Sequence, residues 1–271
     1  MSDPQVTLRE VTRVAGGTLT RGEDAIAVER ALEIRVGGRV LSVTLRTPGH
    51  DPELAIGFLA GEGLIAGAAD VTEARVSAAD CADQPDAIDL TLAPEVRVDW
   101  TRLERHFAAT AACGLCGRAH LESLRAGLTP MAAGPPWPAP ALLGLAARLR
   151  DAQAAFTATG GLHAAAWCDE THEPRVVRED VGRHNAVDKV AGWLVGEGRY
   201  PAGGGLLWVS GRAGAEIVLK AARARIPALA AIGAPSSLAV ELATAAGMTL
   251  IGFLREGRMN VYCGVERVRA S

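Results

Sequence analysis

The first half of the chain alternates apolar and polar positions with the two-residue period of β-strands. Residues 32–46 carry this alternation on both sides of Gly37 and Gly38, and the pattern predicts a β-hairpin with one buried face. A helix should follow, because Asp51 can cap it and Pro52 can occupy its first turn. The apolar face of this helix is formed by Leu54, Ala55, Phe58 and Leu59. The N-terminal part is therefore expected to be β-rich with a helix, an α+β arrangement.

A different pattern begins after the proline-rich segment 134–140, where prolines fix φ and lack amide donors. Strands are predicted at residues 206–209, 227–232 and 248–254, alternating with helices at residues 215–224 and 237–246. This order indicates an α/β fold with a mainly parallel sheet and right-handed crossovers. We expect two domains, residues 1–133 and 134–271. The alternative is that the proline-rich segment forms a rigid surface turn inside a single domain.

Length and charge limit the classes of function. A chain of 271 residues can bury roughly three-quarters of its unfolded surface. Its net charge of −3 supplies no broad basic field, so neither a nucleic acid nor an anionic membrane is expected as a partner. The N-terminus lacks the pattern of a signal peptide, and no apolar run approaches the ~20 residues of a membrane span. We expect a cytoplasmic location.

The five cysteines are an odd number, which argues against a disulfide scaffold in a chain without a secretion signal. Cys113 and Cys116 are closely spaced and come just before a predicted helix. Orphan amides at a helix start favour a thiolate, and Arg118 and His120 could add to this effect. Sulfur relay and a redox pair both remain open from spacing. A zinc site would need a second ligand pair, for which His120 and His163 are the only nearby candidates.

A second group of polar residues spans 178–189, where charged and hydrogen-bonding side chains crowd an otherwise alanine-rich chain. Helical spacing would place His184 and Asp188 one turn apart, so that the carboxylate could orient the imidazole. Asn185 begins the helical pattern. The alternative is a solvated, salt-bridged helix start.

Two turns that follow the predicted strands open helices, one with Ser210 and Arg212 and the other with Ser236 and Ser237. The carboxyl ends of neighbouring parallel strands lie at one edge, where helix-start amides can bind phosphate. Each serine could instead be an ordinary N-cap. A predicted reversal at 252–262 brings two arginines to the same edge, and guanidinium groups suit a phosphate ligand, although an exposed basic turn is equally compatible.

The chain resembles the formate dehydrogenase accessory sulfurtransferase family. The resemblance rests on the blocks Arg46–Gly49, Glu53–Gly63, Cys113–Gly117, Thr159–Ala165, Arg178–Lys189, Ser210–Arg212, Ala234–Ser237 and Gly252–Arg258. These blocks are spread over most of residues 28–262. Ala111 and Ala112 replace the serines common before the first cysteine, and Cys81 and Cys168 are thiols not associated with the family.

This resemblance implies a sulfur carrier that accepts sulfur from a cysteine desulfurase and passes it to the molybdenum bis(molybdopterin guanine dinucleotide) cofactor. Transfer would precede insertion of the cofactor into the formate dehydrogenase catalytic subunit. Cys113 would carry the persulfide and Cys116 would assist. The resemblance further implies a cytidine-deaminase-like three-layer sandwich in the C-terminal part, a homodimer, and the cofactor as bound client, with no permanently bound metal.

The cofactor-binding stretch carried over from the family comprises Phe253, Leu254, Arg255, Glu256, Gly257 and Arg258. With it we group the polar residues of the other blocks, His184, Asn185, Ser210, Arg212, Ser236 and Ser237, as expected contacts of the guanine nucleotide moiety. Zinc-dependent deamination is excluded, because Ala165 stands where the catalytic Glu after His163 would be needed. A non-catalytic chaperone that binds and shields the cofactor is the alternative function.

Overall fold

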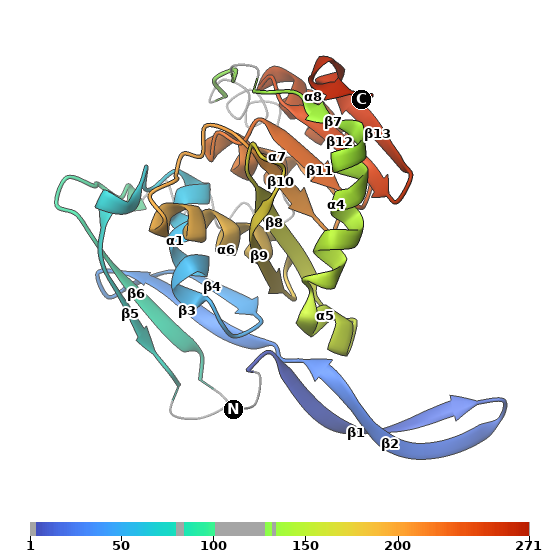
Figure 1. Cartoon of the computed structure of the whole chain (residues 1–271). Helices are drawn as coiled ribbons and strands as arrows, with labels where there is room; N and C mark the ends of the chain where they lie inside the picture. The colour runs from blue at the N-terminus through green and yellow to red at the C-terminus, as the bar shows by residue number, and fades with distance from the viewer. Residues whose placement is uncertain (1–3, 80–83, 101–127, 132–133, 271) are drawn as a thin grey trace.

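The computed structural model describes residues 4–79, 84–100, 128–131 and 134–270. In the described residues of the first half, there are two sheets and one long helix (Figure 1). The elements are β1 (Val6–Ala15), β2 (Thr18–Ala27), β3 (Arg30–Val36), β4 (Arg39–Arg46), α1 (Asp51–Glu62), a 3-10 turn (Ala68–Asp70), β5 (Val71–Ser77) and β6 (Asp86–Leu92). The predicted hairpin and helix are confirmed. Gly37 and Gly38 both adopt positive φ at the β3–β4 turn, and Pro52 lies in the first turn of α1.

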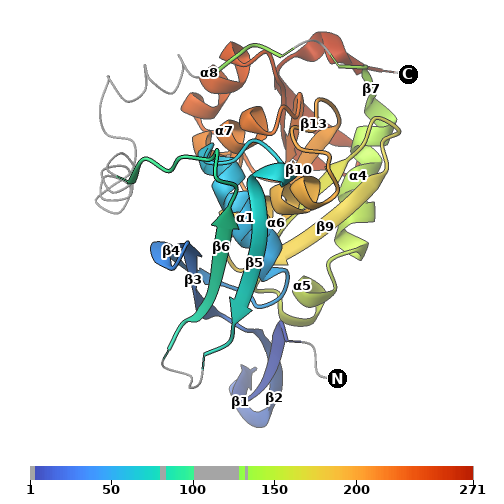
Figure 2. The same ribbon diagram turned by 90° about the vertical axis from the view of Figure 1, so that its left-hand side faces the viewer.

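Strands β1 and β2 form a separate hairpin that projects from the body (Figure 1). They pair along their whole length, from Val6 opposite Ala27 to Ala15 opposite Thr18. The four-stranded sheet has the order β4-β3-β6-β5, and α1 covers one of its faces. Figure 2 shows α1 behind β5 and β6 and next to the second half of the chain.

The second half is built on a six-stranded sheet of order β13-β12-β11-β10-β8-β9. Its strands are β8 (His163–Cys168), β9 (Pro174–Asp180), β10 (Leu206–Val209), β11 (Ala228–Ala231), β12 (Thr249–Arg255) and β13 (Arg258–Cys263). The helices are α4 (Ala139–Asp151), α5 (Ala154–Thr159), α6 (Arg183–Gly196), α7 (Ala215–Arg223) and α8 (Ser237–Ala245). Three short elements complete it, namely β7 (Trp137–Pro138), a 3-10 turn (Val265–Arg267) and β14 (Val268–Arg269).

The three central strands β10, β11 and β12 are parallel, as the alternation of strands and helices predicted. The outer strands β8, β9 and β13 join through antiparallel pairs, so the complete sheet is mixed. Trp137 and Pro138 form a two-residue strand beside β14, and α4 begins directly after them at Ala139. The proline-rich segment therefore leads directly into a helix that packs on the sheet.

Helices cover both faces of this sheet (Figure 1). On one face, Leu142, Leu145 and Leu149 of α4 pack against Trp208 and Leu254. The other face is covered by α6, α7 and α8 through small and branched aliphatic side chains, as expected for a chain with few aromatic residues. Helix–sheet–helix layering thus agrees with an α/β fold, and the cytidine-deaminase-like arrangement stays a prediction.

The two halves of the chain meet where α1 packs against α6. A Cβ added at Gly57 would lie 1.7 Å from the Asp188 carbonyl oxygen, and one at Gly192 would lie 1.8 Å from the Glu53 carbonyl oxygen. Only glycine permits this backbone approach. Nearby, the Arg178 guanidinium donates to both carboxylate oxygens of Glu53, at 2.5 and 2.7 Å. The proposed division into domains at residue 133 therefore falls between two parts that share a close-packed helix pair.

Candidate functional site

Three turns lie side by side at the carboxyl ends of β10, β11 and β12. The Gly233 amide donates to the Gly211 carbonyl at 2.9 Å, and the Ser236 amide donates to the Ala213 carbonyl at 3.1 Å. The third turn joins through the Phe253 amide, which donates to the Gly233 carbonyl at 3.1 Å. The sequence predicted that these turns share one edge of the sheet, and the hydrogen bonds confirm it.

The first turns of α6, α7 and α8 are directed to this same edge, since each helix follows a strand that ends there. Glycines precede α6 and α7, and no side chain caps either start. Ser236 caps α8 by accepting from the Ala239 amide at 3.2 Å, which is the ordinary N-cap role considered from the sequence. Amides at the starts of α6 and α7 are therefore available to an anion.

Asp180 organises the turn that leads into α6. It is fully buried, and its Oδ2 lies 2.7 Å from the Nζ of the equally buried Lys189. Its Oδ1 accepts from the Gly182 amide at 2.8 Å and from Asn185 at 3.0 Å. Lys189 also donates to the Thr47 carbonyl at 2.9 Å, which ties this turn to the N-terminal half.

The predicted pairing of His184 with Asp188 is wrong. Asp188 is buried and accepts from Lys220 at 2.7 Å, whereas His184 Nε2 lies 3.4 Å from Glu216 on α7. The reason is that Asp188 points into the interface of α1, α6 and α7, where the buried ammonium group needs a counterion. Burial raises the pKa of Asp188 to about 6, against the opposing attraction of Lys220.

His163, at the start of β8, is the residue that sequence reasoning did not assign to this edge. A Cβ added at Gly211 would be 3.5 Å from His163 Nδ1 and 3.7 Å from Arg183 Cδ, so these three residues are neighbours. Burial lowers the pKa of His163, and the Arg183 guanidinium lowers it further, while Asp180 acts in the opposite direction. The pKa of His184 is likewise lowered by burial, although Glu216 opposes the change. Both imidazoles are neutral at pH 7.

Three arginines around the turns have guanidinium groups without a hydrogen bond or ion pair within the described part of the chain: Arg183, Arg212 and Arg258. Arg183 precedes His184 in α6, and Arg212 lies exposed in the turn between β10 and α7. Arg255 is held differently, because its Nη1 donates to the Ile232 carbonyl at 2.6 Å and to the Leu254 carbonyl. Guanidinium groups without a protein partner are suited to bind a phosphorylated ligand.

The β12–β13 stretch combines strain with exposure. Phe253 has a φ of 52°, a left-handed conformation that bulky residues rarely adopt, and 42% of its surface is exposed. Such strain of about 1–3 kcal/mol usually persists only where the surroundings or a function require it. Leu254, in contrast, is fully buried against α4 and cannot offer its side chain to a ligand. Glu256, Gly257 and Arg258 are exposed at the turn.

The remaining predicted contacts are placed as follows. Asn185 is engaged within the protein, because its amide donates to the Leu45 carbonyl at 2.8 Å and to Asp180. Ser210 Oγ accepts from the Ala164 amide at 2.9 Å, so its hydroxyl proton remains available to a ligand. Ser237 is exposed in the first turn of α8. Most of these residues therefore lie at the edge of the sheet formed by the turns after β10, β11 and β12, which we call the turn edge. Asn185 and Leu254 instead make contacts within the protein.

The predicted catalytic residues Cys113 and Cys116 lie outside the described residues, as does Cys81. The two cysteines that the structure describes are unsuited to nucleophilic chemistry. Cys168 is fully buried, and burial raises the pKa of its thiol to about 12. Burial also raises the pKa of Cys263, whose sulfur donates to the Met248 carbonyl at 3.3 Å. Both would be thiols at neutral pH, as expected for incidental cysteines.

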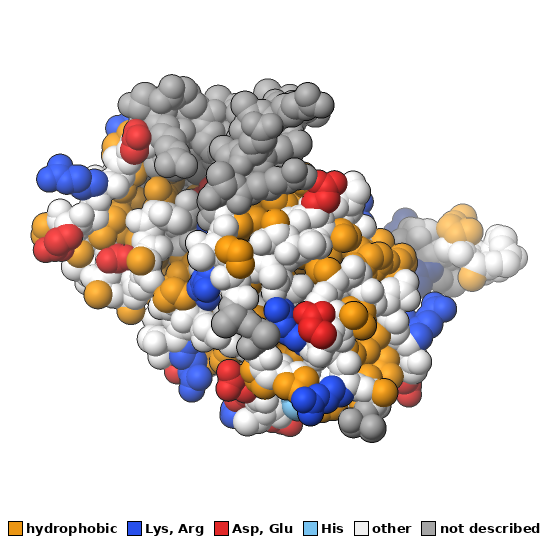
Figure 3. Space-filling model, turned by 90° about the horizontal axis from the view of Figure 1, so that it is seen from above, with side chains coloured by type: hydrophobic (Ala, Val, Ile, Leu, Met, Phe, Trp, Pro, Cys, Tyr) orange, Lys and Arg blue, Asp and Glu red, His pale blue; other side chains and the backbone are white. Residues whose placement is uncertain are grey.

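On the face seen in Figure 3, positive and negative side chains of the described residues are interspersed. Within the described ranges, no three His, Cys, Asp or Glu side chains gather into a metal-binding group. No helix among these residues is both long and apolar enough to cross a bilayer.

Comparison with known proteins identifies the family to which this chain is related. A model of the FdhD/NarQ family matches residues 27–269, which includes every turn of the site. The chain belongs to the FdhD/NarQ family. Two relatives are named sulfur carrier protein FdhD. The one from Nocardia farcinica is 47% identical over 100% of this chain and 97% of that protein. The one from Mycobacterium tuberculosis is 44% identical over 96% of this chain and 97% of that protein.

A crystal structure supports the family assignment. It is that of a protein from Desulfotalea psychrophila, named as a candidate formate dehydrogenase accessory protein. It superposes with a TM-score of 0.77 at 26% identity, covering 98% of this chain and 100% of that protein. The FdhD/NarQ fold therefore extends through both halves of the chain, including the β-rich N-terminal part.

Proposed function

We propose that this protein is a sulfur carrier required for formate dehydrogenase activity. The observation that carries the proposal is the family membership, with relatives named sulfur carrier proteins over the full chain, together with the cysteine pair Cys113 and Cys116 in this sequence. We further propose that the protein is cytoplasmic and works as a homodimer, as expected from the sequence and from the family resemblance.

In the proposed reaction, the Cys113 thiolate attacks the outer sulfur of a persulfide on a cysteine desulfurase. A bond forms between Cys113 Sγ and that sulfur, the desulfurase S–S bond breaks, and its cysteine leaves as a thiolate. The Cys113 Sγ–S bond would then break, so that Cys113 leaves as a thiolate and the sulfane sulfur passes to the molybdenum bis(molybdopterin guanine dinucleotide) cofactor, the substrate, which would supply the electron pair for the new bond. This transfer would precede insertion of the cofactor into the formate dehydrogenase catalytic subunit. Cys116 assists the transfer.

The turn edge supports the nucleotide end of this proposal. The cofactor is the substrate, and its guanine dinucleotide part carries diphosphate groups. Arg183 and Arg212 are guanidinium groups without a partner in the described chain, and uncapped starts of α6 and α7 lie beside them. Phe253 adds an exposed aromatic ring on a strained backbone. These features together suit a phosphorylated, ring-containing ligand.

The alternative is a non-catalytic chaperone that binds and shields the cofactor, since the turn edge alone supports binding and says nothing about sulfur. Activation of formate dehydrogenase in cells lacking the endogenous carrier separates the two. With Cys113→Ser, a carrier loses activation and a chaperone keeps it. Cys263→Ser serves as the matched control, because that thiol is held by Met248 and should not affect activation.

A further inference from the structure

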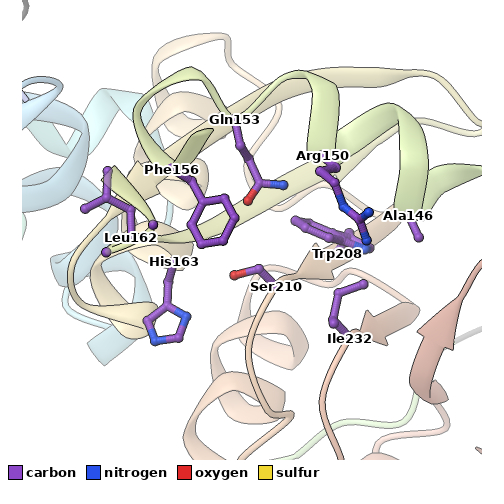
Figure 4. A pocket seen from close by; sticks show the side chains of 11 residues that line it. Ala146, Arg150, Gln153, Phe156, Leu162, His163, Trp208, Ser210 and Ile232 are labelled. Atoms are coloured by element: carbon purple, nitrogen blue, oxygen red, sulfur yellow. The ribbon is translucent and has the colours of Figure 1, made fainter. Parts of the chain in front are cut away.

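The hairpin of β1 and β2 carries a hollow of about 590 Å³ on its middle. This hollow is distinct from the cavity bordered by His163 and Ser210, which adjoins the turn edge and belongs to the site already described (Figure 4). The hairpin projects from the body of the protein (Figure 1). A two-stranded hairpin is only marginally stable in water unless it packs against a further surface. A partner surface is therefore expected on it.

One face of the hairpin presents four rows of side chains beyond its base. Residues directly opposite each other in an antiparallel ladder share a face, and so do alternate residues along each strand. From the base toward the tip, the rows are Leu8 with Ala25, Glu10 with Glu23, Thr12 with Arg21, and Val14 with Leu19. All of these side chains are exposed except Ala25, which is partly buried. The two outer rows are thus apolar, and the two inner rows carry the charges.

The inner rows are electrostatically incomplete within one chain. Glu10 and Glu23 lie directly opposite each other, where like charges repel. Neither carboxylate, nor the guanidinium group of Arg21 in the next row, makes a hydrogen bond or ion pair within the described residues. On the other face of the hairpin, Arg13 pairs with Asp24 at 3.4 Å. The charges of the first face therefore suit opposite charges from another molecule.

The outer rows leave apolar surface in water at both ends of this charged centre. Leu8 near the base is 59% exposed, and Val14 and Leu19 near the tip are each 69% exposed. Apolar side chains that surround a polar centre in this way are typical of a surface that contacts a protein. The partner must itself offer apolar groups at both ends and charges of both signs between them.

We propose that this face docks on the same face of a second copy of the chain, with a two-fold axis between the two inner rows. The inference rests on the homodimer of the proposed function and names a contact surface for it. The two-fold exchanges the rows, so that Arg21 faces the partner's Glu23 and Leu8 faces the partner's Val14. Ala25 faces the partner's Leu19. One face thereby supplies both halves of every contact, as an isologous interface requires.

The shape and size of the face agree with this arrangement. Glu10, Thr12, Arg21 and Glu23 all border the hollow, which leaves room for the partner's guanidinium group. Each strand has 10 residues and is about 34 Å long, and a two-stranded face is about 10 Å wide. Two such faces bury less than the roughly 1,600 Å² of a standard interface. The dimer should therefore dissociate on dilution.

Sedimentation velocity of the full chain over a range of concentrations measures the dissociation constant of the dimer. Arg21→Glu places a carboxylate against carboxylates and should raise this constant at least about tenfold. The double variant Glu10→Lys and Glu23→Lys should do the same, because ammonium groups then meet the guanidinium group. Arg269→Glu makes an equal change of charge in β14, which pairs with β7 at the other end of the molecule (Figure 1), and should have no effect.

Mixing the two hairpin variants decides the assignment. In a mixed dimer, the carboxylate introduced at position 21 of one copy meets the ammonium groups introduced at positions 10 and 23 of the other. The unchanged Arg21 and the unchanged carboxylates form the second contact. The mixture should therefore dimerise at a concentration at which each variant alone is monomeric, a recovery that a folding defect could not produce.

A dissociation constant unchanged by Arg21→Glu, or variants that stay monomeric when mixed, would overturn the assignment of a second copy to this face. A wild type that is monomeric at every concentration would overturn the homodimer as well. Sulfur transfer is scored separately, by persulfide formation on Cys113 in the same preparations. A persulfide without the hairpin contact overturns only the contact, and a hairpin-dependent dimer that never forms the persulfide overturns only the carrier proposal.

Discussion

The charge of the site at neutral pH is set by arginines, because its two histidines are neutral. His163 has a lowered pKa through burial and the neighbouring Arg183, and His184 through burial. Positive charge for an anion therefore comes from the guanidinium groups of Arg183 and Arg212. Ligand binding driven by these groups should weaken as ionic strength rises.

Protonation of His163 should destabilise the fold in mild acid. Its folded pKa lies below the ordinary value of about 6.5, so the unfolded chain binds more protons between those two values. The stabilising contribution is present above pH 6.5 and is lost as the pH falls. Urea unfolding at pH 7.5 and pH 5.5 should show a smaller loss for His163→Gln than for the wild type. Identical losses would contradict the buried, neutral imidazole.

Strain at Phe253 should be separable from its role in binding. Replacement by glycine removes the penalty of a positive φ, so Phe253→Gly should keep or raise the free energy of unfolding by up to about 1 kcal/mol. GDP binding should weaken, because the exposed ring is lost. Chemical denaturation and calorimetric titration on the same preparation measure both effects. A variant that is destabilised and binds GDP normally would show that the ring serves packing alone.

Helices α1 and α6 depend on two glycines for their contact. Alanine at Gly192 would place a methyl group 1.8 Å from the Glu53 carbonyl oxygen, so the helices must separate. We expect Gly192→Ala to lower the free energy of unfolding by about 3 kcal/mol or more, as for strong overpacking.

Gly196→Ala in the same helix is the matched control, because nothing lies within 4 Å of the added Cβ. Its stability should not fall, since alanine is the better helix former. Urea denaturation of the two variants compares them, and equal stabilities would contradict the close packing of α1 on α6.

Elements with strong local signals were predicted well. Gly37 and Gly38 indicated the β3–β4 turn, Asp51 and Pro52 indicated the start of α1, and the alternation after residue 206 predicted three parallel strands. The reversal predicted at 252–262 corresponds to the antiparallel β12–β13 hairpin, whereas the antiparallel strand β9 was not placed in the sheet by the sequence, because pairing partners depend on tertiary contacts. The β1–β2 hairpin was also missed, since it has a weak apolar alternation and is largely exposed.

For the site, the sequence predicted the shared edge of the turns and failed for individual side chains. Asp188 and His184 have the spacing of a catalytic pair, but the buried Lys220 is 32 positions away in sequence and its need for a counterion could not be read locally. His163 entered the sequence analysis as a candidate zinc ligand and within the block Thr159–Ala165, and neither pattern placed it beside the turns. Its position emerges only from the strands that the fold brings to the edge.

At the scale of the whole molecule, buried charges hold the two halves together. Lys220 is buried, and although burial lowers its pKa, Asp188, Glu62 and Glu216 together raise it above the ordinary value. Lys220 therefore joins α7 to Asp188 on α6, with Glu62 of α1 at 4.0 Å. Breaking such a pair leaves an unpaired charge in the core.

Asp188→Asn should lower the free energy of unfolding by about 3–5 kcal/mol, because it removes the counterion of a buried ammonium group. Adding Lys220→Met to this variant should recover part of the loss, since the unpaired charge is then absent. Denaturant unfolding of the two single variants and the double variant provides the cycle. Additive losses would contradict direct coupling between the two residues.

In the proposed function, the turn edge holds the cofactor and Cys113 delivers the sulfur. A persulfide on Cys113 is what distinguishes a sulfur carrier from a chaperone that only binds the cofactor. Neither of the two thiols that the structure describes has a suitable pKa, because burial raises that of both Cys168 and Cys263.

The most direct test is peptide mass spectrometry of the protein after incubation with an active cysteine desulfurase and cysteine. The account predicts one added sulfur atom on the peptide that contains Cys113, absent in Cys113→Ser and unchanged in Cys263→Ser. An unmodified Cys113, with the desulfurase shown to be active in the same mixture, would contradict it.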